Sequence, residues 1–363
     1  MSKLKEFPKI AKDKLPICTF FALLIITAVS AILWSQANDQ GYNLGVTVMA
    51  CALIAIGVAE AVDLILHKLE SSIQLNFVSS AIFGLIVADS YSLGVPGMAQ
   101  ASDILPKALL SAPQCFLYVA LISLIGEVLF KKIVGLSGRK IVNPAAAAKL
   151  VVFLPFMGTI LLVKDHYASY GGGGLGIPTL AGPIGNTVIN GNGLNSFASY
   201  LQSCYTLSTA TTYTSLSQLM VLQKFHGWIG GASSLAVIVV GVSLFALARE
   251  HIKWRITVTY FVGVALMASI MTFIYGGDLF VRIMFEVFIG SSIFLGFFMA
   301  TDPATTPKTY YGQIIFGAGL ATLTVCIQTY MNFFGGSILA LIVMNIVSPL
   351  LDKTNNWHLA TKP

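Results

Sequence analysis

The sequence predicts an all-α, polytopic membrane protein of about ten transmembrane helices, in two inverted five-helix repeats with broken third and eighth helices. Hydrophobic residues fill 56% of the 363 positions and charged residues only 10%, whereas a soluble domain carries about 25% charged residues. The apolar residues fall in runs long enough to cross the hydrocarbon core as helices. Lys and Arg gather at alternate ends of these runs. Together these observations exclude a soluble globular enzyme.

The apolar runs predict the individual spans. Helices are expected because lipid leaves no partner for unpaired backbone groups, and the alternation of a membrane barrel is absent. The predicted spans are residues 15–35, 43–66, 74–90, 113–131, 144–163, 228–248, 256–275, 280–300, 311–330 and 334–352.

The first apolar run differs from a signal peptide. Five lysines precede it, but the run from Leu15 to Ser35 is longer than a typical signal core, and no small-residue cleavage site follows it. We therefore expect this helix to remain in the mature protein.

Basic residues set the predicted orientation, because Lys and Arg near span ends stay cytoplasmic. With the N-terminus inside and ten alternating spans, all 21 Lys and Arg fall inside except Lys107, Lys164, Lys224 and Arg282. Both termini are thus predicted to be cytoplasmic in a cell inner membrane. The net charge of +6 is then a topology signal, and no nucleic-acid partner is expected.

A long loop divides the chain into three predicted parts. Residues 1–163 form the N-terminal five-helix repeat, 164–227 an external loop and 228–363 the C-terminal five-helix repeat. Loops of this length are typically functional or disordered. The stretch Tyr200–Tyr213 is rich in hydroxyls and almost without charge, which is unusual for a solvated linker.

Two spans are interrupted at corresponding places in the two halves. The third ends near Asp89, ahead of Gly94 and Pro96, and the eighth ends at Thr301-Asp302-Pro303. Broken helices in matching positions are typical of inverted-repeat transporters.

Two turns carry candidate binding residues. Asn143 can cap a helix that begins at Pro144, and this capping is the simpler interpretation. Asp302 precedes a proline, so the helix is expected to end there. Its carboxylate can bind a cation or the polar end of a cofactor, or it can stabilise a capped turn.

The outer loop contains a cluster of hydroxyls, Ser208-Thr209-Ala210-Thr211-Thr212. Such clusters are usually turn material. From the residues alone, attachment of a group here is the less expected alternative.

Acidic residues inside apolar runs are costly and tend to mark ion or proton routes. Glu60 and Asp63 lie three apart, on one face of the second helix, and Glu127 and Glu286 also lie in apolar runs. Asp63 and Glu127 lie near inside ends, where they can simply reach headgroups, so Glu60 and Glu286 are the predicted route residues. The cysteines show no metal-ligand spacing, and no metal site is predicted.

Several segments in a fixed order resemble one family, the D subunit of Rnf ferredoxin:NAD oxidoreductases, which is similar to the B subunit of the sodium-pumping NADH:quinone reductase. The resemblance covers most of the chain and depends mainly on the Asn-Pro-Ala turn and the string Met-Ala-Thr-Asp-Pro. The resembling segments are residues 80–85, 143–145, 227–236, 254–256, 298–303, 316–318, 345 and 349–352.

The resemblance implies a covalent flavin. In this family FMN is joined through its phosphate to a threonine in a pattern like Asp-x-x-Ser/Thr-Gly-Ala-Thr. Ser208, Ala210 and Thr211 match this pattern, while Tyr205 replaces the acidic residue and Thr209 replaces the glycine. Thr211 is thus the predicted phosphoester site, with Ser208, Thr209 and Ala210 around it and the flavin loop outside. The resemblance also allows a riboflavin or other second flavin nearer the cytoplasm, close to Asn143 and Asp302.

The resemblance further implies a subunit of a redox-driven pump that moves Na⁺ or H⁺. Its expected partners are other Rnf-type membrane, iron–sulfur and flavin subunits, the lipid bilayer and a flavin transferase that acts during maturation. Three alternatives stay open: a component similar to the B subunit of the quinone reductase, a non-redox channel or transporter on the same fold, and a structural protein of the complex that has lost its flavin.

Overall fold

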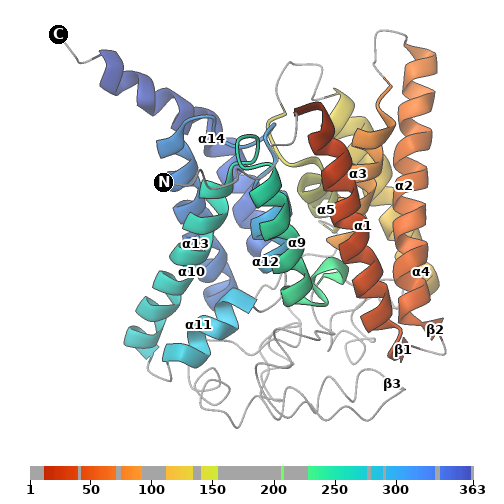
Figure 1. Ribbon diagram of the computed structural model, residues 1–363, viewed down its shortest axis with the longest axis horizontal. Helices are drawn as coiled ribbons and strands as arrows, with labels where there is room; N and C mark the ends of the chain where they lie inside the picture. Colours follow the sequence, from red (N-terminus) through yellow and green to blue (C-terminus); the bar gives the residue numbers. More distant parts are fainter. Residues whose placement is uncertain are drawn as a thin grey trace, which may run out of the picture.

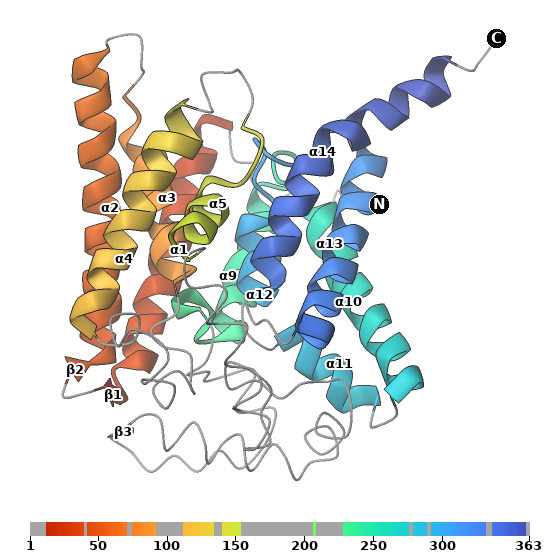
Figure 2. The same cartoon turned by 180° about the vertical axis from the view of Figure 1, so that it is seen from behind.

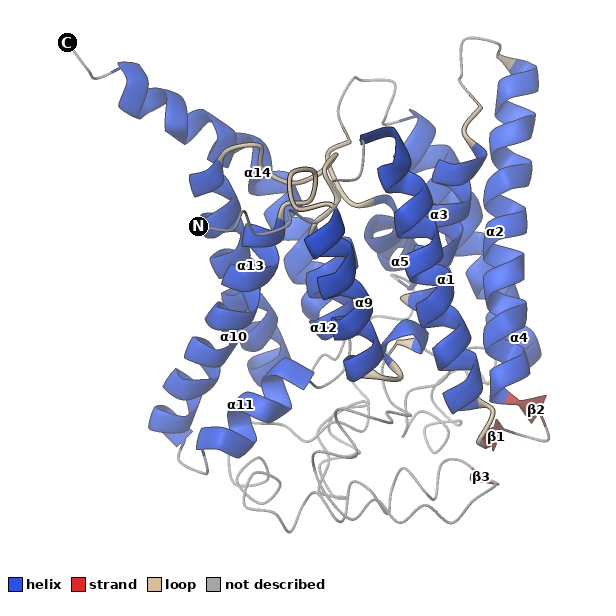
Figure 3. Ribbon diagram, viewed as in Figure 1, coloured by secondary structure: helices blue, strands red, loops and turns tan. Residues whose placement is uncertain are grey.

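The computed structural model describes residues 12–39, 42–70, 75–91, 112–133, 140–153, 206–207, 228–275, 279–288, 292–331 and 336–360. Helices make up nearly all of this part of the chain (Figure 3). Each of the ten predicted spans contains a helix among these residues. The division into two inverted repeats stays a prediction.

The first half of the chain builds one group of helices (Figure 1). It contains a short lead-in turn, five helices, a π-helical extension of the fourth and two short strands. These elements are η1 (Lys12–Lys14), α1 (Leu15–Trp34), β1 (Ala37–Asp39), β2 (Tyr42–Asn43), α2 (Leu44–Leu69), α3 (Phe77–Asp89), α4 (Ala112–Ile125), η3 (Gly126–Ile133) and α5 (Pro144–Phe153).

The second half packs beside the first and contains the remaining helices (Figure 2). Its predicted eighth span is bent by 63° between α11 and the following helical segment, which is upstream of the interruption predicted at Thr301-Asp302-Pro303. Its elements are η8 (Ile229–Gly231), α9 (Ser234–Leu247), α10 (Trp254–Tyr275), α11 (Leu279–Phe288), α12 (Ser292–Phe294), the π-helical η9 (Leu295–Met299), α13 (Tyr310–Met331) and α14 (Gly336–Ala360). The strand β3 (Thr206–Leu207) belongs to the long loop that precedes them.

Short polar side chains start several of these helices. The Asn43 side chain accepts hydrogen bonds from the backbone amides of Gly45 and Val46, and the Asn76 side chain accepts one from Ser79. Ser233 caps α9 in the same way. These residues satisfy amides that a helix leaves without intrahelical partners.

Small residues let the helices approach closely inside each half. A Cβ atom on Gly84 of α3 would lie 2.7 Å from the backbone of Ile56 on α2. A Cβ on Gly317 of α13 would lie 2.8 Å from the Ile256 carbonyl oxygen on α10. Close backbone approach at small residues is a main source of stability where lipid removes the hydrophobic drive between helices.

The outer faces of the bundle are apolar. Phe273 on α10 is 92% exposed, which suits contact with lipid but not with water. Four described helices, α1, α2, α10 and α13, contain stretches long and apolar enough to cross a bilayer, and the bent pair makes a fifth span if counted as one. The helices α3 and α9 are shorter apolar segments. The chain is therefore a polytopic, helical membrane protein.

The N-terminal end of α1 and the C-terminal end of α14 lie at the same end of the bundle (Figure 1), which the predicted orientation makes the inner end. At the opposite end, α1 leads into a small sheet of order β2-β1-β3. In this sheet Ala37 pairs with Leu207 and Asn38 with Thr206, in antiparallel register. Part of the long loop is thereby anchored to the turn between α1 and α2.

Candidate functional site

A cavity opens at the inner end of the bundle, between the two halves. It encloses about 370 Å³, within the roughly 300–1,000 Å³ that small-molecule sites occupy. Its lining combines phenylalanines with amide, hydroxyl and charged side chains. These residues include Asn76, Ser79, Phe83, Lys131, Lys140, Asn143, Phe245, His251, Phe297, Phe298, Thr301 and Asp302.

Asn143 lines this cavity and makes hydrogen bonds both within its own turn and to the second half. Its Oδ1 accepts hydrogen bonds from the Ala145 and Ala146 amides at 3.1 and 3.2 Å, so the predicted cap of α5 is confirmed. Its backbone amide donates to Oδ1 of Asn345 at 2.9 Å, and its Nδ2 donates to the Met299 carbonyl at 3.4 Å. The turn therefore joins the first half to α14 and η9 of the second.

Asp302 lines the same cavity and organises a turn of its own. Its Oδ1 accepts a hydrogen bond from the Ala304 amide at 3.0 Å, and its Oδ2 accepts one from the Thr305 hydroxyl at 3.2 Å. Lys253 closes the turn by donating to the carbonyls of Pro303 and Thr306. The predicted capped turn is thus present, and one carboxylate edge lies at a cavity wall.

The cavity brings together Asn143 of the first half and Asp302 of the second half. Both use oxygen atoms to cap local backbone, and both also line a space that aromatic side chains share. A planar aromatic ligand with polar edges fits such a lining, because phenylalanine rings pack against its faces while amide and hydroxyl groups meet its edge.

The acidic residues at the inner end of the first half form an enclosed network. Glu127 accepts hydrogen bonds from Lys131 at 2.8 and 2.9 Å and one from Ser80 at 3.1 Å. Asp63 accepts from Ser80 and from the Asn76 amide, and it pairs with Lys132. Both carboxylates are 0% exposed.

The expectation that Asp63 and Glu127 reach lipid headgroups is therefore wrong. Helix α2 packs closely against α3 and η3, and the lysines of η3 turn inward to meet the carboxylates instead. Glu60, one turn earlier on α2, is half-buried and does not line the inner cavity.

Glu286, the other predicted route residue, lies apart from the cavity in the interior of the second half. Its side chain is 1% exposed, and neither carboxylate oxygen has a hydrogen-bond partner among the described residues. Arg282, which the charge pattern assigns to the outside, is 0% exposed. Phe280, on the opposite face of α11, is 69% exposed, so the helix turns an apolar face outward and its two charged groups inward.

Asp89 is another buried acidic residue, and it was not predicted as a site from the sequence. Asp89, the last residue of α3, is 0% exposed and accepts hydrogen bonds from the Thr27 hydroxyl at 3.0 and 3.1 Å. A Cβ on Gly230 would lie 2.7 Å from the Asp89 Cβ, so only glycine fits there. The signal was a carboxylate within an apolar run, which the interpretation used only to mark the helix end.

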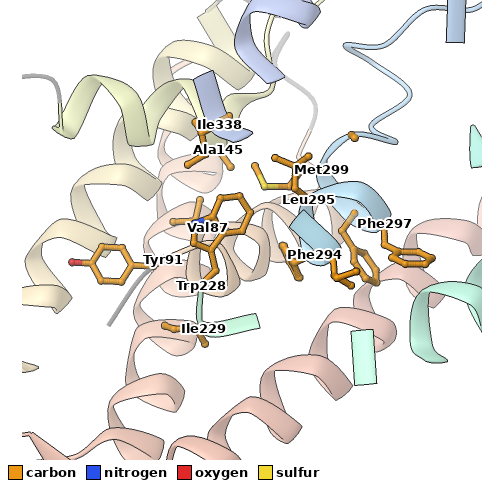
Figure 4. Close-up of a cluster of buried hydrophobic side chains, with 14 of the residues drawn as sticks. Val87, Tyr91, Ala145, Trp228, Ile229, Phe294, Leu295, Phe297, Met299 and Ile338 are labelled. Carbon is orange, nitrogen blue, oxygen red and sulfur yellow. The ribbon is translucent and has the colours of Figure 1, made fainter. Parts of the chain in front are cut away.

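Lys149 is also buried, although the charge pattern counts it at the inner ends of spans. Its ammonium group donates to the Ser90 carbonyl and lies 4.6 Å from the centroid of the Trp228 ring. Trp228 packs edge-on against Phe294, with ring centroids 6.1 Å apart, in the cluster shown in Figure 4. A carbonyl at a helix C-terminus and an aromatic face are both favourable partners for a cation.

The predicted attachment residues Ser208, Thr209, Ala210 and Thr211 lie outside the described residues. The nearest described segment is β3, which ends at Leu207 and pairs with β1.

Comparison with known proteins finds relatives that match most of the chain. The D subunit of the Na(+)-translocating ferredoxin:NAD(+) oxidoreductase complex of Acetobacterium woodii is 26% identical, over 86% of this chain and 82% of that protein. The D subunit of the proton-translocating ferredoxin:NAD(+) oxidoreductase complex of Clostridium ljungdahlii is 26% identical, over 90% of each.

A further relative is the D subunit of the ion-translocating oxidoreductase complex of Aeromonas salmonicida, which is 25% identical over 91% of both chains. The model of the NQR2, RnfD, RnfE family matches residues 12–358. This match includes both halves, the long loop and the two turns at the inner cavity. The chain belongs to the NQR2, RnfD, RnfE family.

Proposed function

We propose that this chain is the D-type membrane component of an Rnf-type ferredoxin:NAD oxidoreductase complex, with FMN attached to Thr211 and a second flavin in the inner cavity. The single observation that carries the proposal is the family match over residues 12–358, together with relatives named as D subunits that span most of the chain. Both of these relatives belong to ferredoxin:NAD(+) oxidoreductase complexes, which favours that reaction over quinone reduction.

The attachment site is proposed from the Ser-x-Ala-Thr core at residues 208–211. The pairing of β3 with β1 supports an outer location, because β1 follows the end of α1 that is opposite the lysine-rich N-terminal segment. In this proposal the Thr211 hydroxyl oxygen holds the FMN phosphate as an ester, and the covalent bond keeps the cofactor from being lost at the outer surface.

The inner cavity suits a non-covalent flavin. Phe297 and Phe298 would pack against the ring system, and Asn143 and Asp302 would lie at its polar edge. A bound flavin supplies one-electron transfer between partner proteins. The phenylalanines of the chain would exclude water from the flavin, and the polar groups would orient its ring.

The translocated ion is Na⁺ in the name of one relative and H⁺ in that of another, at the same 26% identity. Overall similarity therefore does not select the ion. Moving one charge against 100 mV requires about 2.3 kcal/mol, so a modest drop in redox potential is sufficient for either ion.

The attachment is tested with the chain produced alongside a flavin transferase and its partner subunits. We expect a fluorescent band on a denaturing gel and the mass of one flavin phosphate on the peptide that contains Thr211. Thr211→Val should abolish both signals, whereas the matched neighbour Thr212→Val should keep them. A dark wild-type band would reject covalent attachment and favour the transporter or the flavin-free structural protein.

The same Thr211→Val protein tests the second flavin. The native complex is washed and then denatured with acid. The molar amount of released flavin should be similar to the molar amount of the chain. If the chain separated from its partners releases none, the inner cavity does not hold a flavin.

A further inference from the structure

Several buried polar atoms without hydrogen-bond partners among the described residues gather where α11 ends. They are both carboxylate oxygens of Glu286, the Tyr260 hydroxyl and the Thr324 hydroxyl. Buried polar atoms are almost always hydrogen-bonded, and each exception calls for an explanation such as a bound water or ion. Here the exceptions share one place.

These groups come from successive helices of the second half. Tyr260 lies on α10, Glu286 on α11, Ser292 on α12 and Thr324 on α13. The Tyr260 hydroxyl lies near enough to the Ser292 and Thr324 hydroxyls to interact with both, and Glu286 acts on it as a nearby charge. The Ser292 hydroxyl lies 3.4 Å from the Glu286 carbonyl oxygen, across the break between α11 and α12. The oxygens therefore converge from four helices, and the Glu286 carboxylate stays unsatisfied among them.

Among the described residues, the charged and titratable neighbours of the carboxylate come from α10, α11 and α13. Arg282 precedes Glu286 by one turn on α11, and both Cys326 of α13 and Tyr260 are electrostatic neighbours of Glu286. None of them donates a hydrogen bond to the carboxylate. Arg282 offers the carboxylate an opposite charge but no hydrogen bond. Because a buried carboxylate is costly unless its oxygens are satisfied, these oxygens favour a cationic ligand.

The backbone favours the same ligand. Glu286 lies in the last turn of α11, where the carbonyl end of the helix presents partial negative charge and the Ser292 hydroxyl meets the Glu286 carbonyl oxygen. Helices broken inside a membrane protein use such carbonyl ends to coordinate Na⁺ or H⁺. Oxygen atoms from carboxylate, hydroxyl and carbonyl groups are the ligands that hard cations prefer.

We infer that Glu286, Tyr260, Ser292 and Thr324 form a binding site for a small monovalent cation, Na⁺ or H⁺, at the break between α11 and α12. The choice of these two ions rests on the proposed ion-translocating function. The site is separate from the inner cavity, and it places a cation within the second half of the bundle.

The test uses dicyclohexylcarbodiimide, a membrane-permeant reagent that modifies protonated buried carboxyl groups. The assembled complex is labelled in detergent over a range of pH, with NaCl or choline chloride at equal ionic strength, and modification of Glu286 is measured by mass spectrometry. A Na⁺ site predicts labelling that NaCl slows by about tenfold when Na⁺ is tenfold above its dissociation constant. A proton site predicts labelling that falls as pH rises and is indifferent to NaCl.

Two variants keep the carboxylate and alter its surroundings. Tyr260→Phe and Thr324→Val each remove one ligand oxygen, and each should raise the Na⁺ concentration for half-protection by about tenfold, or shift the pH dependence, as expected for one lost polar contact. Thr322→Val is the matched control, because Thr322 is exposed and its hydroxyl donates to the Ala318 carbonyl of its own helix.

The inference is overturned if Glu286 of the wild-type complex is not labelled at any pH, or if neither ion condition nor either variant changes the labelling. This result does not depend on the flavins. Loss of flavin attachment with a cation-protected Glu286 would reject only the proposed electron carrier, whereas an unreactive Glu286 in a flavin-loaded, pumping complex would reject only this site.

Discussion

The two halves of this protein each carry a buried glutamate and a basic residue one helical turn apart, in opposite order. In the first half Glu127 precedes Lys131, and the two side chains meet at 2.8 Å inside a network with Ser80. In the second half Arg282 precedes Glu286, and no described residue hydrogen-bonds to the carboxylate. Burial is nearly the same, so burial alone does not explain the difference.

The order of the residues explains part of it. Helical side chains lean toward the N-terminus, and an acid placed one turn before a base forms the better pair. The rest of the difference comes from the residues around each glutamate. The Ser80 hydroxyl of α3 donates to Glu127, whereas the hydroxyls near Glu286 make no hydrogen bond to its carboxylate. A satisfied buried pair holds helices together, whereas an unsatisfied carboxylate is available to a ligand.

The largest effect is expected when the satisfied pair is broken. Lys131→Met leaves Glu127 buried without its counter-charge and should lower the free energy of unfolding by about 3–5 kcal/mol. The measurement is thermal or denaturant unfolding of the purified chain in detergent. Lys308→Met is the control, because Lys308 is exposed and its replacement should be nearly neutral. A stable Lys131→Met protein would mean that the first-half network is not structural.

A smaller effect is expected at the hydroxyl that links the first-half acids. Ser80 contacts Asp63 at 3.1 Å and Glu127 at 3.1 Å, and it accepts from Lys131 at 3.0 Å. Ser80→Ala should cost about 1.5–3 kcal/mol, the usual contribution of hydrogen bonds to charged groups. The adjacent, half-exposed Ser79→Ala is the comparison in the same unfolding assay, and equal losses for both would argue against the network.

The smallest effect is expected in the second half. Glu286→Gln removes a charge that no described hydrogen bond stabilises, so the free energy of unfolding should change by no more than about 1 kcal/mol and can increase. Glu127→Gln, measured in parallel, leaves Lys131 without its partner and should be clearly destabilising. If the two variants lose the same stability, the contrast between the halves fails.

Much of the fold could be predicted because its signals are local. The starts of α1, α2, α5 and α10 fall within two residues of the predicted spans, since a run of apolar residues or a capping asparagine is sufficient to mark them. The end of the eighth span just before Asp302-Pro303 follows from the restriction that proline places on the preceding residue. The start of α3 was less exact: the span was predicted from residue 74, whereas the helix begins at Phe77 after its Asn76 cap.

The candidate sites were predicted less completely. Asn143 and Asp302 were singled out separately, but their meeting in one cavity depends on the packing of η9 and α5 across the two halves. Lys149 and Arg282 were counted as charges at span ends, and the fold buries both. Their burial depends on contacts with residues far away in the sequence, and a count of charges along the chain contains no information about such contacts.

The sequence by itself determined that the chain is embedded in lipid, where most of its helices begin and that the turns at Asn143 and Asp302 are capped, because these properties depend on hydropathy and on hydrogen bonds between near neighbours. Only the tertiary structure decided which buried charges are satisfied. That outcome depends on how closely helices from distant parts of the chain approach, and it separates the closed network around Glu127 from the open carboxylate of Glu286.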